Sequence, residues 1–263
     1  MNTLPSFSLD DYRRLLQAMK SRGAAFHPLS ELPSLTGSRN FVCLRHDVDC
    51  HLLGTTDMAD IEAEEGARAT YYVLMTGHYN PRSKACRPVL NRLVALGHEI
   101  GLHYDLSTYP QAPEAAAAHL RNEAAALADA AGAPVRTVSC HYPHKGLPDF
   151  FKSSEEFVHC HDPRCTQDML YVSDSSRGWR DSNLIQWLNA EPCSASRGLE
   201  LLTHPEVWHA GHLKDRIEYF DEILMPLATR EVNQTLAREL RDIWFVHDGA
   251  MMHDARERAS GRL

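Results

Sequence analysis

Histidine and aspartate side chains gather where short apolar runs of this sequence end. The apolar run at 41–44 is followed directly by Arg45-His46-Asp47-Val48-Asp49. In an extended chain, residues two apart point to the same side, so the Asp47 and Asp49 carboxylates are expected to face one direction. Two adjacent carboxylates repel each other unless a proton or a metal ion lies between them. The segment therefore predicts a site for a cation, a proton or both.

Five further apolar segments end in residues of the same kinds. These strand ends carry His78, Tyr79 and Asn80; His103 and Asp105; His141 and Tyr142; Asp174; and His204. The carboxyl ends of parallel strands meet at one edge of a sheet or one mouth of a barrel. Chance would place one or two such residues there, but not residues at nearly every strand end. We therefore interpret the set as a functional site.

Some of these residues also have a simpler structural interpretation. Asp105 and Asp174 each follow a strand and could serve only as the N-cap of the next helix. His98 lies five residues from His103 on the opposite face, where a hydrogen-bonded structural histidine is the expected role. The segment at 159–165 (HCHDPRC) contains metal donors, but they are packed too tightly for a standard zinc spacing. Helix capping and core packing thus compete with function at these positions.

Alternating strands and helices are expected to position the strand ends. Strands are predicted at 41–44, 69–75, 98–103, 135–140, 169–172 and 199–203, with a short one near 156–159. Helices are predicted at 8–20, 55–65, 87–96, 113–131, 213–224 and 228–242, and the tail at 251–263 is expected to be flexible. This alternation indicates an α/β fold with a parallel sheet, either doubly wound or closed as a barrel.

Composition and charge narrow the class of protein. The 263 residues could form one large domain or two small ones, and 43% hydrophobic residues suffice for a sizeable core. With 27 basic and 35 acidic residues the formal net charge is −8, which disfavours nucleic acid and anionic membrane surfaces as partners. We find no signal-peptide pattern at the first residues and no apolar stretch of the roughly 18 residues that a membrane helix needs. Seven scattered cysteines, an odd number, favour reduced thiols and a cytoplasmic location.

Three segments resemble motifs of the NodB-homology polysaccharide deacetylase family. They are 44–49 (LRHDVD), 97–103 (GHEIGLH) and 202–205 (LTHP), in the family's order, and the likeness spans about residues 40–210. Within the family the chain is most similar to the WbmS-type proteins of lipopolysaccharide O-antigen loci, whose first motif is also Arg-His-Asp-Val-Asp. The resemblance implies a distorted (β/α)7 barrel forming a single domain over 1–263. It further implies that the N-terminal helix at 8–20 and the C-terminal helices at 213–242 pack on this core.

The resemblance also implies chemical roles for individual residues. The family removes N- or O-acyl groups, usually acetyl, from sugars with one divalent metal, most commonly Zn²⁺. Matched motif by motif, Asp47 would be the general base, Asp49 a metal ligand and His204 the general acid. His103 matches the first histidine of the family's His-x-x-x-His ligand pair.

Two positions depart from the family pattern. The second ligand histidine should stand at 107, where this chain has Ser107, and the third-motif arginine that orients the base is missing. A catalytic zinc ion normally has three protein ligands and a water molecule. We expect His141 to supply the third ligand, with His78 and Asp105 as the next candidates.

The remaining motifs identify residues that would contact the substrate or support the site. The segment 141–143 (HYP) occupies the place of the family's Arg-Pro-Pro-Tyr motif, and Asp174 and Trp179 stand where the fourth motif has Asp and Trp. Arg45 and Arg180 are the candidates to replace the missing arginine. The complete set of expected substrate-binding and supporting residues is Arg45, His46, His78, Tyr79, Asn80, Asp105, Tyr142, Asp174, Trp179 and Arg180.

The resemblance implies a metal-dependent carbohydrate de-N-acylase acting on an amino-sugar intermediate of surface polysaccharide or O-antigen biosynthesis. The acyl group could be acetyl or formyl, and the sugar could be nucleotide-, lipid- or glycan-linked. Two alternatives stay open: a catalytically impaired sugar-binding homologue, which Ser107 would favour, and a metal-dependent barrel sugar isomerase. A Schiff-base aldolase is disfavoured because Lys145 is the only lysine near a strand end. The sequence does not determine the oligomeric state.

Overall fold

The structure of the chain is a computed structural model. It describes residues 4–35, 37–142, 153–163, 169–175, 178–179, 183–190, 198–208, 216–227, 229–230 and 232–233. Lys145, Cys165, Arg180, most of the predicted helix at 228–242 and the tail at 251–263 lie outside these ranges.

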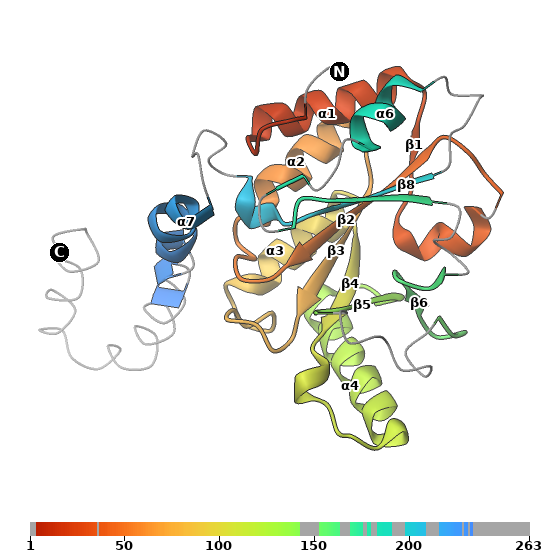
Figure 1. Cartoon of the computed structure of the whole chain (residues 1–263). Coiled ribbons are helices and arrows are strands. Elements are labelled where there is room, and N and C mark those ends of the chain that lie inside the picture. The colour runs from red at the N-terminus through yellow and green to blue at the C-terminus, as the bar shows by residue number, and fades with distance from the viewer. Residues whose placement is uncertain are drawn as a thin grey trace, which may run out of the picture.

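One parallel sheet forms the centre of the fold (Figure 1). Its strands run in the order β6-β5-β4-β3-β2-β8-β7, and β1 pairs with the start of β2. The bounds are β1 Ala25–Phe26, β2 Phe41–Val48, β3 Ala69–Leu74, β4 Glu99–Tyr104, β5 Thr137–Cys140, β6 Val158–His159, β7 Met169–Ser173 and β8 Gly198–Thr203. The predicted α/β class, single domain and barrel-like run of seven strands are confirmed, with β1 as an eighth strand beside β2. The sheet is a curled half-barrel, because β6 and β7, at the two ends of the path, do not pair with each other in the described residues.

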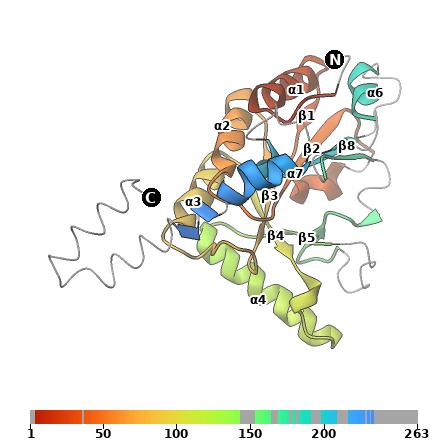
Figure 2. The same cartoon turned by 60° about the vertical axis from the view of Figure 1, so that its left-hand side comes forward.

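Four helices lie in a row along the outer face of the sheet (Figures 1 and 2). They are α1 Leu9–Ser21, α2 Thr55–Glu65, α3 Cys86–Ala95 and α4 Pro113–Ala131, each within one residue of its predicted bounds. Farther along the chain are α6 Asn183–Asn189 and α7 Arg216–Tyr219, which continues as a π-helical turn over Phe220–Leu224. The sequence analysis missed α6, β1 and a 3-10 helix at Leu29–Leu35, all of which are short.

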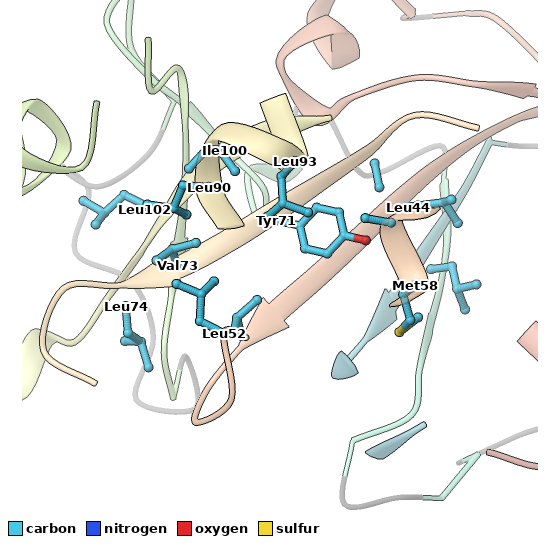
Figure 3. Packing of buried hydrophobic residues seen from close by; sticks show 14 of the residues in the cluster. Leu44, Leu52, Met58, Tyr71, Val73, Leu74, Leu90, Leu93, Ile100 and Leu102 are labelled. Carbon is cyan, nitrogen blue, oxygen red and sulfur yellow. The ribbon is translucent and has the colours of Figure 1, made fainter. Parts of the chain in front are cut away.

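Strand β2 is buried along its whole length, so its residues alternate between two enclosed environments. Leu44 and Val48 face the helices, where Leu44 packs in the large apolar cluster with Met58 and Tyr71 (Figure 3). Cys43 faces the interior of the half-barrel, in a separate cluster. The same alternation sends Arg45 and Asp47 to the interior and His46 to the helical side.

Gly101 on β4 makes room for an aromatic ring inside the half-barrel. A Cβ atom at this position would lie 2.5 Å from the Tyr72 ring and 2.7 Å from the Thr137 hydroxyl oxygen. Such distances are far below van der Waals contact, so any larger residue would displace the ring. The second glycine of the GHEIGLH segment therefore has a packing role two residues before the interior-facing His103.

A buried glutamate joins helix α2 to the outer face of the sheet. Glu62 is fully buried, and its carboxylate accepts hydrogen bonds from Tyr12 and, at 2.8 Å, from the Tyr71 hydroxyl. His46 Nε2 lies 2.6 Å from the same carboxylate, and His46 Nδ1 lies 2.6 Å from the Thr203 hydroxyl. The structure thus places His46, which we had expected among the supporting residues of the site, in the interface between the helices and the sheet.

Removing the Glu62 carboxylate is expected to destabilise the fold strongly. Glu62→Ala should lower the free energy of unfolding by about 3–5 kcal/mol, because it leaves buried hydrogen-bonding partners, including His46, unpaired. Glu64 on the same helix is the matched control: its carboxylate pairs with Arg13 at the surface, so Glu64→Ala should cost less than about 1 kcal/mol. Chemical denaturation of both variants measures the difference. Equal losses would contradict the assigned role of Glu62.

His98 has the structural role that we expected for it. Its ring is buried, Nδ1 accepts a hydrogen bond of 3.2 Å from the backbone N–H of Ala69, and Nε2 lies 3.1 Å from the carbonyl oxygen of Ala59.

Among the described residues, no helix combines the length and apolar character required to cross a membrane.

Candidate metal centre

Asp49, His103 and His141 bring three metal-binding atoms together at the carboxyl end of the sheet. Asp49 directly follows β2, His103 lies near the end of β4, and His141 directly follows β5. One donor atom from each residue lies within 4.8 Å of the other two. Asp49 Oδ1 is 3.5 Å from His103 Nε2 and 3.5 Å from His141 Nδ1, and the two nitrogen atoms are 3.1 Å apart.

Strand pairing explains why His103 and His141 meet. β4 and β5 are paired in parallel with His103 opposite Ser139, and the backbone N–H of His141 donates to the Tyr104 carbonyl at 2.8 Å. His141 is therefore carried one step beyond β5, beside His103. The position at 107, where the resembling family has a histidine, instead lies in an exposed 3-10 turn at Leu106–Thr108.

The chemistry of these donors fits a divalent metal ion. His103 Nδ1 lies 3.1 Å from the Ser139 carbonyl oxygen, which only accepts hydrogen bonds, so Nδ1 carries the proton and the Nε2 lone pair faces Asp49. Asp49 Oδ1 is buried and has no hydrogen-bond donor among the described residues. Tetrahedral ligands about 2.0–2.1 Å from zinc lie about 3.3 Å from one another, close to the three separations found here.

Asp47 is held beside these donors by Arg45. The guanidinium donates from Nε to Asp47 Oδ1 at 2.9 Å and from Nη2 to Oδ2 at 2.8 Å. Arg45 is itself buried, donating to Glu200 at 3.2 Å and to the Ser139 hydroxyl at 2.6 Å. Of the two arginines expected to orient Asp47, Arg45 is the one in contact with it, whereas Arg180 lies outside the described residues.

The environment of Asp47 keeps its carboxylate ionised. Burial alone would raise the pKa of Asp47, but Arg45, together with the nearby His103 and His204, outweighs burial and lowers it to about 2. Asp47 Oδ2 lies 3.6 Å from His103 Nε2. A proton acceptor therefore stands next to the three donor atoms.

His204 lies next to Asp49 and is oriented by Asp174. His204 Nδ1 is 2.7 Å from Asp174 Oδ1, while Asp174 Oδ2 accepts the His204 backbone N–H at 3.1 Å and the Trp208 indole N–H at 2.8 Å. Burial lowers the pKa of His204, but the Asp174 carboxylate, together with Asp49 and Asp47, outweighs burial and raises it to about 10. His204 Nε2, which lies 3.9 Å from Asp49 Oδ2, therefore carries a proton at neutral pH.

Several other expected residues lie outside this group of donors. His78 and Asn80 are exposed in the segment that follows β3. Tyr79 is buried: its hydroxyl donates to the Val48 carbonyl at 2.6 Å and accepts the Leu74 N–H at 3.0 Å. Tyr79 therefore holds together the ends of β2 and β3.

Asp105 has the helix-capping role that the sequence analysis considered for it. Its carboxylate accepts the backbone N–H of Ser107 at 2.9 Å. Neither Asp105 nor His78 belongs to the group formed by Asp49, His103 and His141 in the described residues.

Tyr142 and Trp179 have contrasting positions. The Tyr142 side chain is 64% exposed, its ring centroid lies 3.9 Å from that of His141, and its backbone has a positive φ of 61°. Trp179 donates from its indole N–H to the Pro5 carbonyl at 2.9 Å and stacks on Phe7. Tyr142 thus lies beside the metal-binding atoms, whereas Trp179 holds the N-terminal segment against the core.

The segment at 159–161 supports the site without joining the donors. His159 Nε2 lies 2.8 Å from the Tyr104 hydroxyl, and His161 Nε2 lies 3.4 Å from Arg45 Nη2. Burial lowers the pKa of His159 to about 4, so its ring is neutral.

Sequence reasoning missed Ser139, Glu200 and Glu206. Ser139 precedes His141 by two residues, so strand alternation could have identified it as a residue on the same face. Glu200 and Glu206 reach Arg45 and the Asp49 backbone, respectively, from more than 150 residues away. Only the pairing of β2 with β8 brings them there, and no local sequence signal indicates it.

No protein-family model matches the chain, and a search of curated proteins gave no match. Among solved structures, the Streptococcus pyogenes deacetylase PplD, in complex with acetate, is similar at 20% identity and a TM-score of 0.44, over 57% of this chain and 68% of that one. A family 4 acetyl xylan esterase from Clostridium thermocellum, in complex with a cobalt ion, has 17% identity and a TM-score of 0.42, over 74% and 89%. A CE4 family pseudoenzyme from Bacillus anthracis has 14% identity and a TM-score of 0.43, over 73% and 62%. At these values the activity has to be argued from the chain's own residues.

Proposed function

We propose that this chain is a metal-dependent carbohydrate de-N-acylase, a hydrolase of the C–N amide bond of an N-acylated sugar. The observation that carries the proposal is the combination of Asp49, His103 and His141 with two flanking groups of opposite character. Asp47 is a carboxylate held by Arg45, and His204 is a protonated imidazole held by Asp174. A proton acceptor and a proton donor next to three metal-binding atoms are the groups that amide hydrolysis requires.

In the proposed mechanism, Asp49, His103 and His141 hold the metal ion. When bound, a divalent metal supplies a Lewis acid that polarises the acyl oxygen and lowers the pKa of water. Asp47 accepts the proton that a water molecule loses as its oxygen bonds to the acyl carbon. His204 donates its Nε2 proton to the amide nitrogen as the C–N bond breaks. The products are the free acid and the amino sugar, and proton exchange with solvent restores Asp47 and His204.

The amide reaction is the one that most needs His204. An amine is a poor leaving group unless it is protonated, whereas an alkoxide released from an ester depends less on an acid. The pKa of about 10 keeps the His204 proton in place at neutral pH until the nitrogen becomes basic. We propose acetyl or formyl as the acyl group, since the described residues do not distinguish them.

We further propose that the substrate is a nucleotide- or lipid-linked amino-sugar intermediate of surface polysaccharide or O-antigen biosynthesis. Support comes from the WbmS-type motif Arg45-His46-Asp47-Val48-Asp49. A cytoplasmic location is part of the same proposal. In the described residues Cys43, Cys140 and Cys160 are free thiols, as a reducing compartment would keep them.

The experiment that tests the function measures acyl release from N-acetyl and N-formyl amino sugars, both free and nucleotide-linked. The purified protein should release acetate or formate together with a primary amine in equal amounts. Removal of metal by a chelator should abolish release, and Zn²⁺ or Co²⁺ should restore it. Metal-loaded protein that binds the sugars but releases neither acid would contradict hydrolysis and support the catalytically impaired sugar-binding alternative.

A further inference from the structure

Glu206 connects the turn that carries His204 to the segment that carries Asp49. It lies in the 3-10 helix Pro205–Val207, directly after β8 and His204, and is 3% exposed. Its Oε1 atom accepts the backbone N–H of Asp49 at 3.0 Å and the backbone N–H of Cys50 at 3.3 Å. A single carboxylate oxygen thus binds two successive amides of the segment after β2.

These two hydrogen bonds form where strand pairing no longer fixes the backbone. The pairing of β2 with β3 ends at Val48, one residue before Asp49, and the pairing of β2 with β8 ends at His46. The conformation of Asp49 therefore depends on contacts outside the sheet. Glu206 supplies two such contacts through one side-chain oxygen acceptor.

The buried Glu206 carboxylate is not expected to stabilise the fold by itself. Glu206 Oε2 is buried and has no hydrogen-bond partner among the described residues. Burial raises the pKa of Glu206, and the nearby Asp49 carboxylate, which has the same charge, raises it further. Burial of an incompletely bonded carboxylate next to another one is unfavourable, so its benefit has to come from what it holds.

The Glu206 backbone is anchored as well. The Tyr219 hydroxyl, from α7, donates to the Glu206 carbonyl oxygen. Tyr219 is buried, so the turn is fixed by a second contact that does not involve the Glu206 carboxylate. The Glu206 carboxylate therefore extends from a fixed backbone and is able to hold the Asp49 segment in one place.

We propose that Glu206 is a positioning residue that sets the metal affinity of the site by fixing the backbone of Asp49. This inference requires the metal site of the proposed function but does not require that the protein hydrolyses N-acyl sugars. Groups that orient a metal ligand commonly change metal affinity by about 10–100-fold when they are removed. Glu206 and His204 lie in the same turn. The contact between Glu206 and the Asp49 backbone therefore also holds the metal ligand Asp49 close to His204, the proposed proton donor.

Three variants of Glu206 separate its hydrogen-bonding role from its bulk and charge. Glu206→Leu keeps the size but removes the acceptor, and Glu206→Asp keeps the charge but is one methylene too short to reach both amides. Both should raise the dissociation constant for Zn²⁺ and for Co²⁺ by about 10–100-fold, measured on metal-free protein by competition with a chromogenic chelator. Glu206→Gln keeps an oxygen acceptor at the same reach and should stay within about threefold of the unmodified protein.

Glu62→Gln is the matched control, because Glu62 is also a buried glutamate but contacts none of the three metal-binding residues. It should lower folding stability and leave the metal dissociation constant unchanged, with circular dichroism showing that each protein is folded at the assay temperature. The absorption spectrum of bound Co²⁺ should change in the Leu and Asp variants and stay the same in the Gln variant.

Unchanged metal affinity in folded Glu206→Leu or Glu206→Asp would overturn the proposal. A loss in Glu206→Gln equal to that in Glu206→Leu would also overturn it, because the acceptor would then be irrelevant. Metal affinity is measured without substrate, so these outcomes are independent of acyl release. A protein that binds metal as described but hydrolyses no N-acyl sugar would refute the proposed function and leave the role of Glu206 intact.

Discussion

Loss of bound metal is the expected result of replacing Asp49 with alanine, and the same holds for His103 and His141. These residues contribute the three donor atoms that lie within 4.8 Å of one another, and two remaining ligands hold a divalent ion poorly. Turnover of an N-acyl sugar should fall by more than about 10³-fold, since a Lewis acid contributes several kcal/mol of transition-state stabilisation. Elemental mass spectrometry after dialysis gives the metal content of each variant.

His78→Ala is the informative comparison for this set. His78 was the next candidate for the third ligand but is exposed and outside the group of donors, so its variant should keep one metal ion per chain. If His141→Ala kept its metal and His78→Ala lost it, the third metal ligand would be His78 and not His141. Metal absent from the unmodified protein after reconstitution would remove the basis of the hydrolase mechanism.

His204→Ala is expected to slow de-N-acylation by about 10²–10⁴-fold while metal binding persists. The size follows from the usual contribution of a general acid that protonates the leaving group. Asp174→Asn should slow the same step less, because it removes the negative charge that raises the pKa of His204 but keeps a side chain of the same shape. Steady-state rates of both metal-saturated variants on an N-acetyl amino sugar measure the effect.

The leaving group provides the control for His204. An acyl compound that releases 4-nitrophenolate needs no proton on its leaving oxygen, so His204→Ala should lose much less activity on it than on the amide. Full activity of His204→Ala on the amide would show that another group donates the proton. An equal loss on both compounds would indicate that His204 acts in binding or in the attack of water instead.

Strand periodicity accounts for much of what the sequence predicted correctly. Residues two apart on β2 share a side, which explains why Asp47 and Asp49 both lie within about 4 Å of His103 Nε2. The same rule, which we did not apply to Arg45 and His46, would have put Arg45 on the side of Asp47 and His46 on the other side. We had included His46 among the site residues because it lies in the same motif, although strand alternation places it on the opposite face. The structure agrees with the alternation.

Other features depend on contacts that a single sequence does not reveal. His141 reaches His103 only through the register of β4 with β5, and Glu206 reaches Asp49 only through the pairing of β2 with β8. By contrast, Asp105 contacts an amide two residues away, so its local capping role could be proposed from the sequence. Prediction was thus most successful where one strand or one turn decides the geometry.

The Arg45–Asp47 contact connects the two departures from the family pattern. In the resembling family an arginine near the position of His141 orients the base, and a histidine at the position of Ser107 completes the ligands. Here Arg45 orients Asp47 from the same strand, so an arginine at position 141 is not needed to orient the base. His141 instead lies next to Asp49 and His103. In our proposal these are therefore two halves of one exchange of roles. In our proposal Ser107 is tolerated only with His141 as the third ligand, and histidine at 141 is tolerated only with Arg45 orienting the base.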